Sequence, residues 1–288
     1  MRIESRDNGN ILSPLVSIIV PTYNSARTLR LCMGSLRRQT YRHFELIVVD
    51  NYSEDDTVSI ARDFGATILY GGRERSEQKN NGARHACGEF LYFVDSDFVL
   101  ERDVIFKCVE ACRFFDAVCT VNYSLGKGLW GKSIALKEYF LAHDPTIQVA
   151  RFIRRKAFFE VGCFDEKLVV GEDLDLYARL LECGYKVGRV NAVEWHIGEP
   201  QTLRDVARRN FYYGKNVLAY FGKRGKLAVK QLSPFKPSLF FKIVRSGSPF
   251  IFSLAVVDMV RWMSSLAGML CSINLSEKRT FKMERDFR

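Results

Sequence analysis

The first hundred residues alternate short apolar runs with amphipathic segments, and this alternation constrains the fold more than any other feature. The apolar runs are residues 15–21, 44–50, 66–70 and 89–95. The segments between them, residues 25–40, 53–65 and 76–88, carry helix signals. In the first of these, Leu29, Cys32, Met33 and Leu36 have the spacing of one helix face behind a Ser25 cap. Strands that alternate with helices predict an α/β fold, with a mostly parallel sheet flanked by helices.

The remaining signals continue this mixed pattern. Helical patterns lie at residues 101–115, 132–143 and within 171–187, and strand-like runs at 116–122, 147–155 and just before His196. We expect a glycine-bearing loop at residues 123–131. The helix within 171–187 begins with Glu172, Asp173 and Asp175, acids that the helix dipole favours at that end.

Polar residues follow the predicted strands where an open sheet binds its ligands, beyond the carboxyl ends. They are Thr22, Tyr23, Asn24, Asp50, Asn51, Asp95 and Asp97. Asp95 and Asp97 stand one residue apart in "FVDSDF". Carboxylates this close disfavour each other's ionised form unless a cation or donors compensate. This pair therefore indicates either a solvated turn or a cation site.

One block, residues 201–245, accounts for the whole net charge of +10. The block has a single acid, Asp205, and eleven basic residues: Arg204, Arg208, Arg209, Lys215, Lys223, Arg224, Lys226, Lys230, Lys236, Lys242 and Arg245. Such a block favours an anionic partner surface, either a membrane leaflet or nucleic acid.

An apolar run from Pro249 to Cys271 follows this block and approaches the roughly 20 residues that span a bilayer. It contains Asp258 and Arg261. On a helix, one arc holds Ser253, Asp258, Arg261, Ser264, Ser265 and Gly268, and the opposite arc holds Phe252, Val256, Met259, Met263, Leu266 and Leu270. We expect a helix lying in a membrane interface. The alternatives are a helix packed on the protein's own core or in a dimer interface, and a true membrane span.

The cysteines and the N-terminal segment bear on the compartment. The eight cysteines include no CxxC pair, and several lie in apolar runs, so free thiols and a reducing, cytoplasmic setting are expected. Residues 1–13 are polar, lack the apolar core of a secretory signal, and are expected to be disordered.

Five segments, in order, resemble the inverting family 2 glycosyltransferases, enzymes of the GT-A fold that transfer a sugar from a nucleotide diphosphate to an acceptor. They are "VSIIVPTYN", "ELIVVDNYSEDDT", "EQKNNGARHACGEFLYFVDSD", "VGCFDEKLVVGEDLDLYARLLECGYKV" and "VEWHIG". The resemblance covers roughly residues 15–215. It implies a catalytic domain at 14–222, which leaves 223–288 as a basic, helical and membrane-associating extension.

The resemblance also implies roles for individual residues. Pro21, Thr22, Tyr23, Asp50, Lys79 and Asp95 would bind the nucleotide sugar. Thr22 and Tyr23 would line the nucleoside pocket, with Asp50 toward the base and Asp95 toward the ribose. Lys79 stands where the family usually has Arg, near the base or phosphates, and loses the bidentate fork of that residue. Asn51 replaces a common second Asp.

Metal ligation and base catalysis are implied in the same way. Asp97 and His196 would bind Mn²⁺ or Mg²⁺, the second cation being less suited to a histidine ligand. Asp173 would be the general base that deprotonates an acceptor hydroxyl. The plainer interpretations are a structural histidine and acids that merely open a helix. If the acceptor is a polyprenyl phosphate, its oxygen is already anionic and no base is required.

The expected function is single sugar transfer, since the "QxxRW" element of processive synthases is absent and "RRNFYYGKN" occupies that region. The expected partners are a UDP- or GDP-sugar, a glycan or lipid-linked acceptor, and a membrane surface, with no nucleic acid. The expected location is cytoplasmic, on the inner face of the cell membrane. The alternatives are a polyprenyl-phosphate sugar synthase and a nucleic-acid-binding protein that uses residues 201–245.

Overall fold

The computed structural model describes residues 13–144, 147–233 and 236–286, with side chains described as far as residue 274. The predicted disorder of residues 1–13 therefore lies outside the described residues, apart from Ser13. The predicted division at residue 222 stays a prediction, and the helix that contains this position continues to Arg224.

One eight-stranded sheet forms the centre of the molecule, in the order β3-β2-β1-β4-β7-β6-β8-β5. The four predicted N-terminal strands are β1 (Val16–Thr22), β2 (Phe44–Asp50), β3 (Thr67–Tyr70) and β4 (Phe90–Phe93), and they are all parallel. Every residue of β1 is buried, as the continuous apolar run of a central parallel strand requires. The expected α/β sheet is confirmed.

The other half of the sheet is mixed. β7 (Ala150–Arg154) is antiparallel to both β4 and β6 (Ala117–Ser124), and β8 (Val187–His196) is parallel to β6. β5 (Phe98–Leu100), which sequence patterns did not predict, pairs antiparallel with the end of β8. This short strand directly follows Asp97 and pairs Phe98 with His196.

Helices cover both faces of the sheet. Those in the first two thirds of the chain are α1 (Ala26–Arg37), α2 (Thr57–Asp63), α3 (Arg75–His85), α4 (Val104–Ala111), α5 (Gly128–Leu141), α6 (Arg155–Glu160) and α7 (Glu172–Glu182). Ser25 is at the N-cap of α1 as predicted, but its hydroxyl makes no cap bond to the helix and donates to the Tyr23 carbonyl. The predicted loop ends early, because α5 begins at Gly128.

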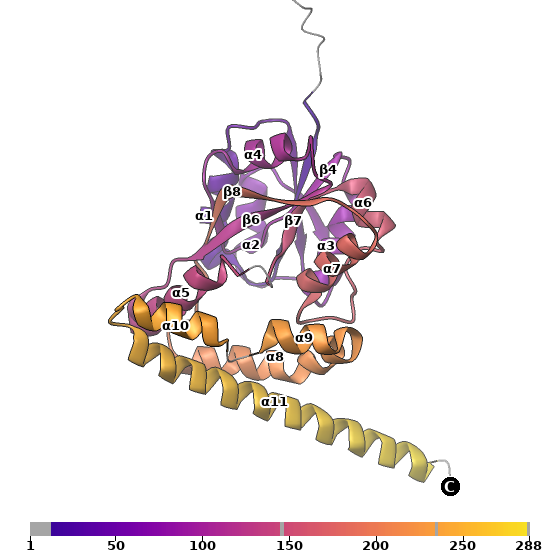
Figure 1. Ribbon diagram of the computed structural model, residues 1–288. Coiled ribbons are helices and arrows are strands. Elements are labelled where there is room, and N and C mark those ends of the chain that lie inside the picture. Colours follow the sequence, from indigo (N-terminus) through magenta and orange to yellow (C-terminus); the bar gives the residue numbers. More distant parts are fainter. Residues whose placement is uncertain (1–12, 145–146, 234–235, 287–288) are drawn as a thin grey trace, which may run out of the picture.

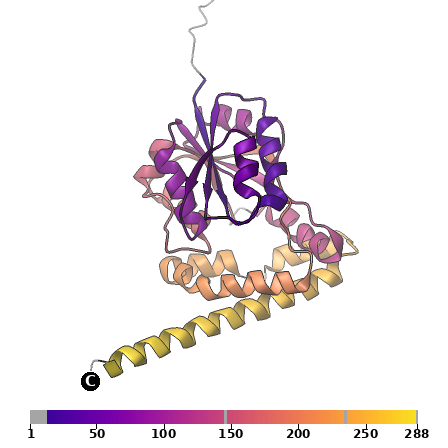
Figure 2. The same cartoon turned by 180° about the vertical axis from the view of Figure 1, so that it is seen from behind.

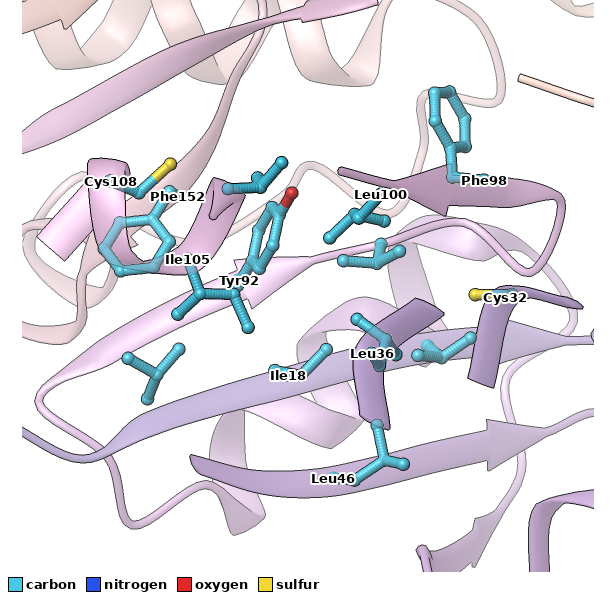
Figure 3. Close-up of a cluster of buried hydrophobic side chains, with 14 of the residues drawn as sticks. Ile18, Cys32, Leu36, Leu46, Tyr92, Phe98, Leu100, Ile105, Cys108 and Phe152 are labelled. Carbon is cyan, nitrogen blue, oxygen red and sulfur yellow. The ribbon is translucent and has the colours of Figure 1, made fainter. Parts of the chain in front are cut away.

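Alternate residues of β1 reach opposite faces of the sheet and two separate cores. Ile18 packs in a cluster with α1 and α4, where Figure 3 shows Leu36 and Tyr92 beside it. Ile19 belongs to the other cluster, with α6 and α7. Cys32 and Cys108 pack as small apolar groups, and burial raises the pKa of both thiols. The predicted buried face of α1 is confirmed.

The remaining helices form a separate layer at the carboxyl ends of the parallel strands (Figures 1 and 2). They are α8 (Leu203–Arg224), α9 (Lys226–Leu232), α10 (Pro237–Arg245) and α11 (Ile251–Asp286). The long helix α11 runs along the side of α8 that faces away from the sheet (Figure 1).

The polar arc of α11 faces the protein. Asp258 accepts a hydrogen bond from Lys137 of α5 at 2.8 Å, and Ser265 donates to the Asn210 carbonyl of α8 at 3.3 Å. The two helices cross with their backbones in contact. A Cβ on Gly214 would lie 2.1 Å from the Ser265 carbonyl oxygen, and one on Gly268 would lie 2.2 Å from that of Phe211.

The apolar arc of α11 faces outward. Its members are each at least 36% exposed: Phe252, Val256, Met259, Met263, Leu266 and Leu270. The segment Ile251–Asn274 is long and apolar enough to cross a bilayer by length and composition alone. The two predicted arcs are present, but the polar one faces the protein, with Asp258 still 32% exposed.

Asp175 ties α7 to α8. Its buried carboxylate accepts hydrogen bonds from Arg179 at 2.8 Å, Lys223 at 3.1 Å and Arg224 at 2.7 Å. Burial raises the pKa of this carboxyl, but the three cations outweigh burial and hold the pKa below its ordinary value. The predicted role at the helix dipole is therefore secondary to an ion-pair network that joins the two layers.

Asp175→Asn is expected to lower the free energy of unfolding at pH 7 by about 3 kcal/mol, because it removes the buried carboxylate that three partly exposed cations share. The depressed pKa makes this contribution complete above the unfolded value of about 4 and lost as pH falls below it. The free energies of unfolding of variant and parent in urea should therefore differ at pH 7, and the difference should shrink as pH falls below about 4 toward the depressed pKa.

Asp63→Asn is the matched control. Asp63 pairs with Arg30 at 3.6 Å, and both side chains are exposed, so the substitution should cost less than about 1 kcal/mol. Equal losses in the two variants would show that Asp175 does not join the layers.

Candidate active site

Three parallel strands end at the same edge of the sheet and bring the first predicted residues together. The Thr22 hydroxyl donates to Asp50 Oδ1 at 2.8 Å, and the Ser53 hydroxyl donates to the same oxygen at 2.6 Å. Pro21 lies within β1, and the Tyr23 side chain that follows is exposed. These residues form one wall of the edge, with the Asp50 carboxylate buried behind the rest.

Gln78 fixes helix α3 to this wall. Its amide nitrogen donates to the carbonyls of Thr22 and Val49, each at 2.8 Å. The next residue on the helix is Lys79, so these two bonds also hold the Lys79 backbone close to the ends of β1 and β2. Sequence reasoning missed Gln78, although it lies in the "EQKNNG" segment.

Lys79 lies at the centre of the site. Its ammonium is buried, 3.3 Å from Asp173 Oδ1 and 3.6 Å from Asp95 Oδ1. The ring of Phe164 lies 5.1 Å below it. Burial lowers the pKa of this amine, but the attraction of Asp173 and Asp95 outweighs burial and raises the pKa above its ordinary value. The predicted ribose ligand and the predicted base therefore share one cation, whereas the expected contact of Lys79 with base or phosphates stays a prediction.

Asp95 has a second cation, Arg151, which sequence reasoning missed. The Arg151 guanidinium lies 3.7 Å from Asp95 Oδ2, 3.5 Å from Glu194 Oε2 and 4.3 Å from the centre of the Phe98 ring. Burial raises the pKa of Asp95, but Lys79 and Arg151 hold it well below its usual range. Asp95 Oδ1 is buried and accepts no hydrogen bond from the described residues, although the Lys79 ammonium lies 3.6 Å away. The sequence signal that could have identified Arg151 is the presence of a charged residue within the strand-like run 147–155.

Strand β5 brings Asp97 and His196 together. Asp97 Oδ2 lies 2.9 Å from His196 Nε2, and the Ile197 amide donates to the Asp97 carbonyl at 2.9 Å. The other ring nitrogen, Nδ1, lies 2.8 Å from Glu199 Oε1. Burial lowers the pKa of His196, but the hydrogen bonds to Asp97 and Glu199 raise it to about 10. Glu199, also missed from sequence, is the orienting carboxylate that metal-binding histidines commonly have.

These residues fit a divalent cation. Asp97 and His196 offer one carboxylate oxygen and one imidazole nitrogen that lie 2.9 Å apart, close enough to bind the same ion. This mixed oxygen and nitrogen pair suits Mn²⁺. Gly198 allows this close approach, because a Cβ there would lie 2.0 Å from Asp97 Oδ2. Within the described part of the chain, no group of three or more potential metal-binding side chains occurs, so further ligands would come from the substrate or water.

Asp173 is positioned by the start of α7. Gly171, at the N-cap, has φ 78°, and a Cβ there would lie 2.7 Å from the ring of Tyr220, so only glycine suits this turn. The preceding acid, Glu172, is buried 3.6 Å from Arg75. Burial and the charge of Asp173 raise the pKa of Glu172. Glu172 and Asp175 pair with cations outside the centre of the site, whereas Asp173 pairs with Lys79 at that centre.

Comparison with known proteins identifies the family and the fold of the chain. The family model described as glycosyl transferase family 2 matches residues 17–165, and that of glycosyl transferase family group 2 matches residues 127–276. Glycosyltransferase GlyA of Streptococcus pneumoniae is 35% identical over 232 residues, which are 74% of this chain and 31% of GlyA. Glycosyltransferase AglE of Haloferax volcanii is 28% identical over 222 residues, 70% of this chain and 72% of AglE.

The chain spans 32% to 60% of the length of the uncharacterized Rickettsia glycosyltransferases that it also matches. Among solved structures, mannosyltransferase PcManGT of Pyrobaculum calidifontis, determined with GDP-Man and Mn²⁺, has a TM-score of 0.55 at 18% identity. The alignment covers 96% of this chain and 84% of PcManGT and confirms the expected GT-A fold. The first family model alone covers more than half of the 288 residues, and the chain therefore belongs to glycosyl transferase family 2.

Proposed function

We propose that this glycosyltransferase moves one sugar from a nucleotide-diphosphate sugar to an acceptor hydroxyl, with inversion at the anomeric carbon. The contact of Lys79 with both Asp95 and Asp173 carries this proposal. It holds a carboxylate suited to the donor and one suited to the acceptor on either side of a single buried ammonium. Membership of the family and the likeness to a structure with bound GDP-Man support a UDP- or GDP-sugar as the donor.

The donor would lie along the carboxyl edge of β1, β2 and β4. Thr22, Tyr23 and Asp50 would meet the nucleoside, and the Asp95 carboxylate would lie toward the ribose. Asp97 and His196 would hold Mn²⁺ or Mg²⁺ beside the diphosphate. When bound, this cation would offset the negative charge that grows on the departing diphosphate.

Asp173 would act on the acceptor. As the acceptor oxygen attacks the anomeric carbon, its proton passes to the Asp173 carboxylate. The bond between the anomeric carbon and the diphosphate oxygen breaks, and its electron pair leaves with the diphosphate. Lys79 orients Asp173 from behind, because its ammonium lies 3.3 Å from one carboxylate oxygen.

A peripheral position on the inner face of the cell membrane is part of this proposal. The outward apolar arc of α11 supplies one attraction to a bilayer. In the basic block, Arg209, Lys223, Arg224 and Lys236 form ion pairs with acids of the protein. The others are exposed and, within the described residues, have no ion-pair partner: Arg204, Arg208, Lys215, Lys226, Lys230, Lys242 and Arg245. Each can add about 1 kcal/mol of attraction to anionic lipid.

The exposed arc of α11 also favours a second candidate, a polyprenyl-phosphate sugar synthase. In that reaction the acceptor is a phosphate monoester whose oxygen is anionic at neutral pH. Asp173 would then position the acceptor without taking a proton.

Asp97→Asn should lower metal-dependent donor hydrolysis by about 100-fold or more at saturating donor, because the amide keeps the shape of the ligand but removes its charge. The measurement is nucleotide release from a panel of UDP- and GDP-sugars with Mn²⁺. Asp63→Asn, at the far end of α2, should match the parent. Parent-like turnover by Asp97→Asn in the presence of a chelator would remove the proposed metal site.

Asp173→Asn separates the two candidate reactions. For a hydroxyl acceptor, loss of the base should lower the transfer rate by about 10²- to 10⁴-fold while donor affinity stays near that of the parent. For a phosphate acceptor, the rate should fall much less. Single-turnover kinetics with each acceptor class measures this, and the anomeric coupling constant of the product tests inversion.

The combined replacement of Phe252, Met259 and Met263 by Ser should weaken vesicle binding at least about tenfold, because it removes apolar surface from the outward arc. Flotation with vesicles that contain phosphatidylglycerol measures the bound fraction. The parent should bind less tightly as salt is raised.

The matched control replaces Leu31, Phe106 and Phe114 by Ser. These side chains are also exposed, but they lie on or beside α1 and α4, away from the helical layer. They should leave flotation unchanged. Failure of the parent to float, or equal loss in both triple variants, would contradict membrane contact through α11.

A further inference from the structure

A cavity of about 600 Å³ lies between α5, α8, α9, α10 and α11, separate from the residues of the candidate active site. Its apolar lining includes Leu141, Val217, Phe221, Trp262, Leu266 and Met269. The volume falls in the range of about 300–1,000 Å³ that is usual for small-molecule sites. Nothing in the proposed transfer reaction requires this space.

The charged residues of the lining are paired with one another or with nearby acids. Lys137 donates to Asp258 at 2.8 Å, and Lys236 donates to Asp144 at the same distance. Arg261 lies 3.7 Å from Glu138. These pairs join α5 to the C-terminal helices and present hydrocarbon walls to the cavity. The chemistry that fits is therefore an apolar chain and not an anion.

The cavity is continuous with the outward arc of α11. Met263 and Leu266 line it, and both are also exposed on the outer surface of the helix. An apolar chain that leaves a bilayer beneath α11 would thus remain on apolar surface as it entered. A freely soluble polar ligand would gain nothing from this route.

The other end of the cavity approaches the proposed base. Val170 lines the cavity, and Asp173 follows three residues later, which limits the separation of their Cα atoms to about 11 Å. Phe221 also lines it, and the ring of the preceding residue, Tyr220, packs on Gly171 at the start of α7. A molecule whose chain fills the cavity would therefore have its polar head near the start of α7.

We propose that this cavity binds the hydrocarbon chain of a lipid acceptor and so directs the acceptor's head group to Asp173. The inference rests on the proposed function and adds the substrate class, a lipid with a linear isoprenoid or alkyl chain. The binding energy comes from the chain, and the head group is selected elsewhere.

The test is calorimetric titration of the full chain with farnesyl phosphate, dodecyl phosphate and inorganic phosphate, each below its aggregation concentration. The chain-bearing phosphates should bind, with inorganic phosphate neither binding nor competing. Tighter binding of the first would identify an isoprenoid acceptor, and tighter binding of the second an alkyl one. Binding of neither, or equal competition by inorganic phosphate, would overturn the proposal.

Val217→Trp should weaken chain binding at least tenfold, because it fills the cavity from α8. Leu270→Trp is the matched control, since Leu270 is exposed on α11 and does not line the cavity. It should leave binding within twofold of the parent. The reverse pattern would mean that the chain lies on the outer surface of α11, and the proposal would be wrong.

Two further measurements distinguish loss of lipid binding from misfolding of the variant and from failure of the proposed transfer reaction. A diazirine-bearing farnesyl phosphate should label peptides 210–221 and 262–269 of the unaltered chain, and labelling elsewhere would contradict the cavity. Mn²⁺-dependent donor hydrolysis should be unchanged in Val217→Trp. Donor hydrolysis without lipid binding would remove this inference alone, whereas lipid binding without any donor hydrolysis would remove the transferase proposal.

Discussion

The buried ammonium of Lys79 forms ion pairs with carboxylates from two distant parts of the chain. The geometry of the candidate active site depends on these ion pairs. Asp95 follows β4, whereas Asp173 opens α7. A buried cation costs several kcal/mol in desolvation, which only well-placed opposite charges offset. Arg75 on the same helix repeats the arrangement with Glu172. The charged residues that would bind donor and acceptor therefore also hold α3, α7 and the end of β4 in place relative to one another.

The helical layer shows a reversal of the usual amphipathic arrangement. In a water-soluble helix the apolar arc packs on the protein. In α11 the polar and small residues pack there together with Leu254 and Val257, and the arc from Phe252 to Leu270 is left outside. Ion pairs and hydrogen bonds to α5 and α8 add to a small apolar cluster at this contact, in which Val257 packs against Ile134 and Val206. The same helix thus supplies both a wall of the cavity and the surface that we propose meets a bilayer.

The sequence predicted the features that follow from periodicity. The ends of β1, β2 and β4 placed Thr22, Asp50 and Asp95 on one edge, and the two arcs of α11 were recognisable. Periodicity gives the faces of a helix but not their surroundings, so the inward direction of the polar arc could not be predicted. β5 has only three residues, too few for any period. Arg151 acts through Asp95 and Glu194, which are distant in sequence, and one sequence alone gives no measure of such contacts. Glu199 lies three residues after His196, but the sequence does not indicate that the two side chains meet.

The crossing of α8 and α11 at Gly214 and Gly268 has a mechanical consequence. Because the backbones of α8 and α11 are in contact, neither helix can rotate or shift along the other without a steric clash. The two helices therefore form one rigid unit. The ion pairs of Asp175 connect the α8 side of this unit to α7. A membrane surface that bound α11 would therefore fix the orientation of the whole sheet relative to the membrane. It would also fix the distance between the membrane and the place where the sugar is transferred.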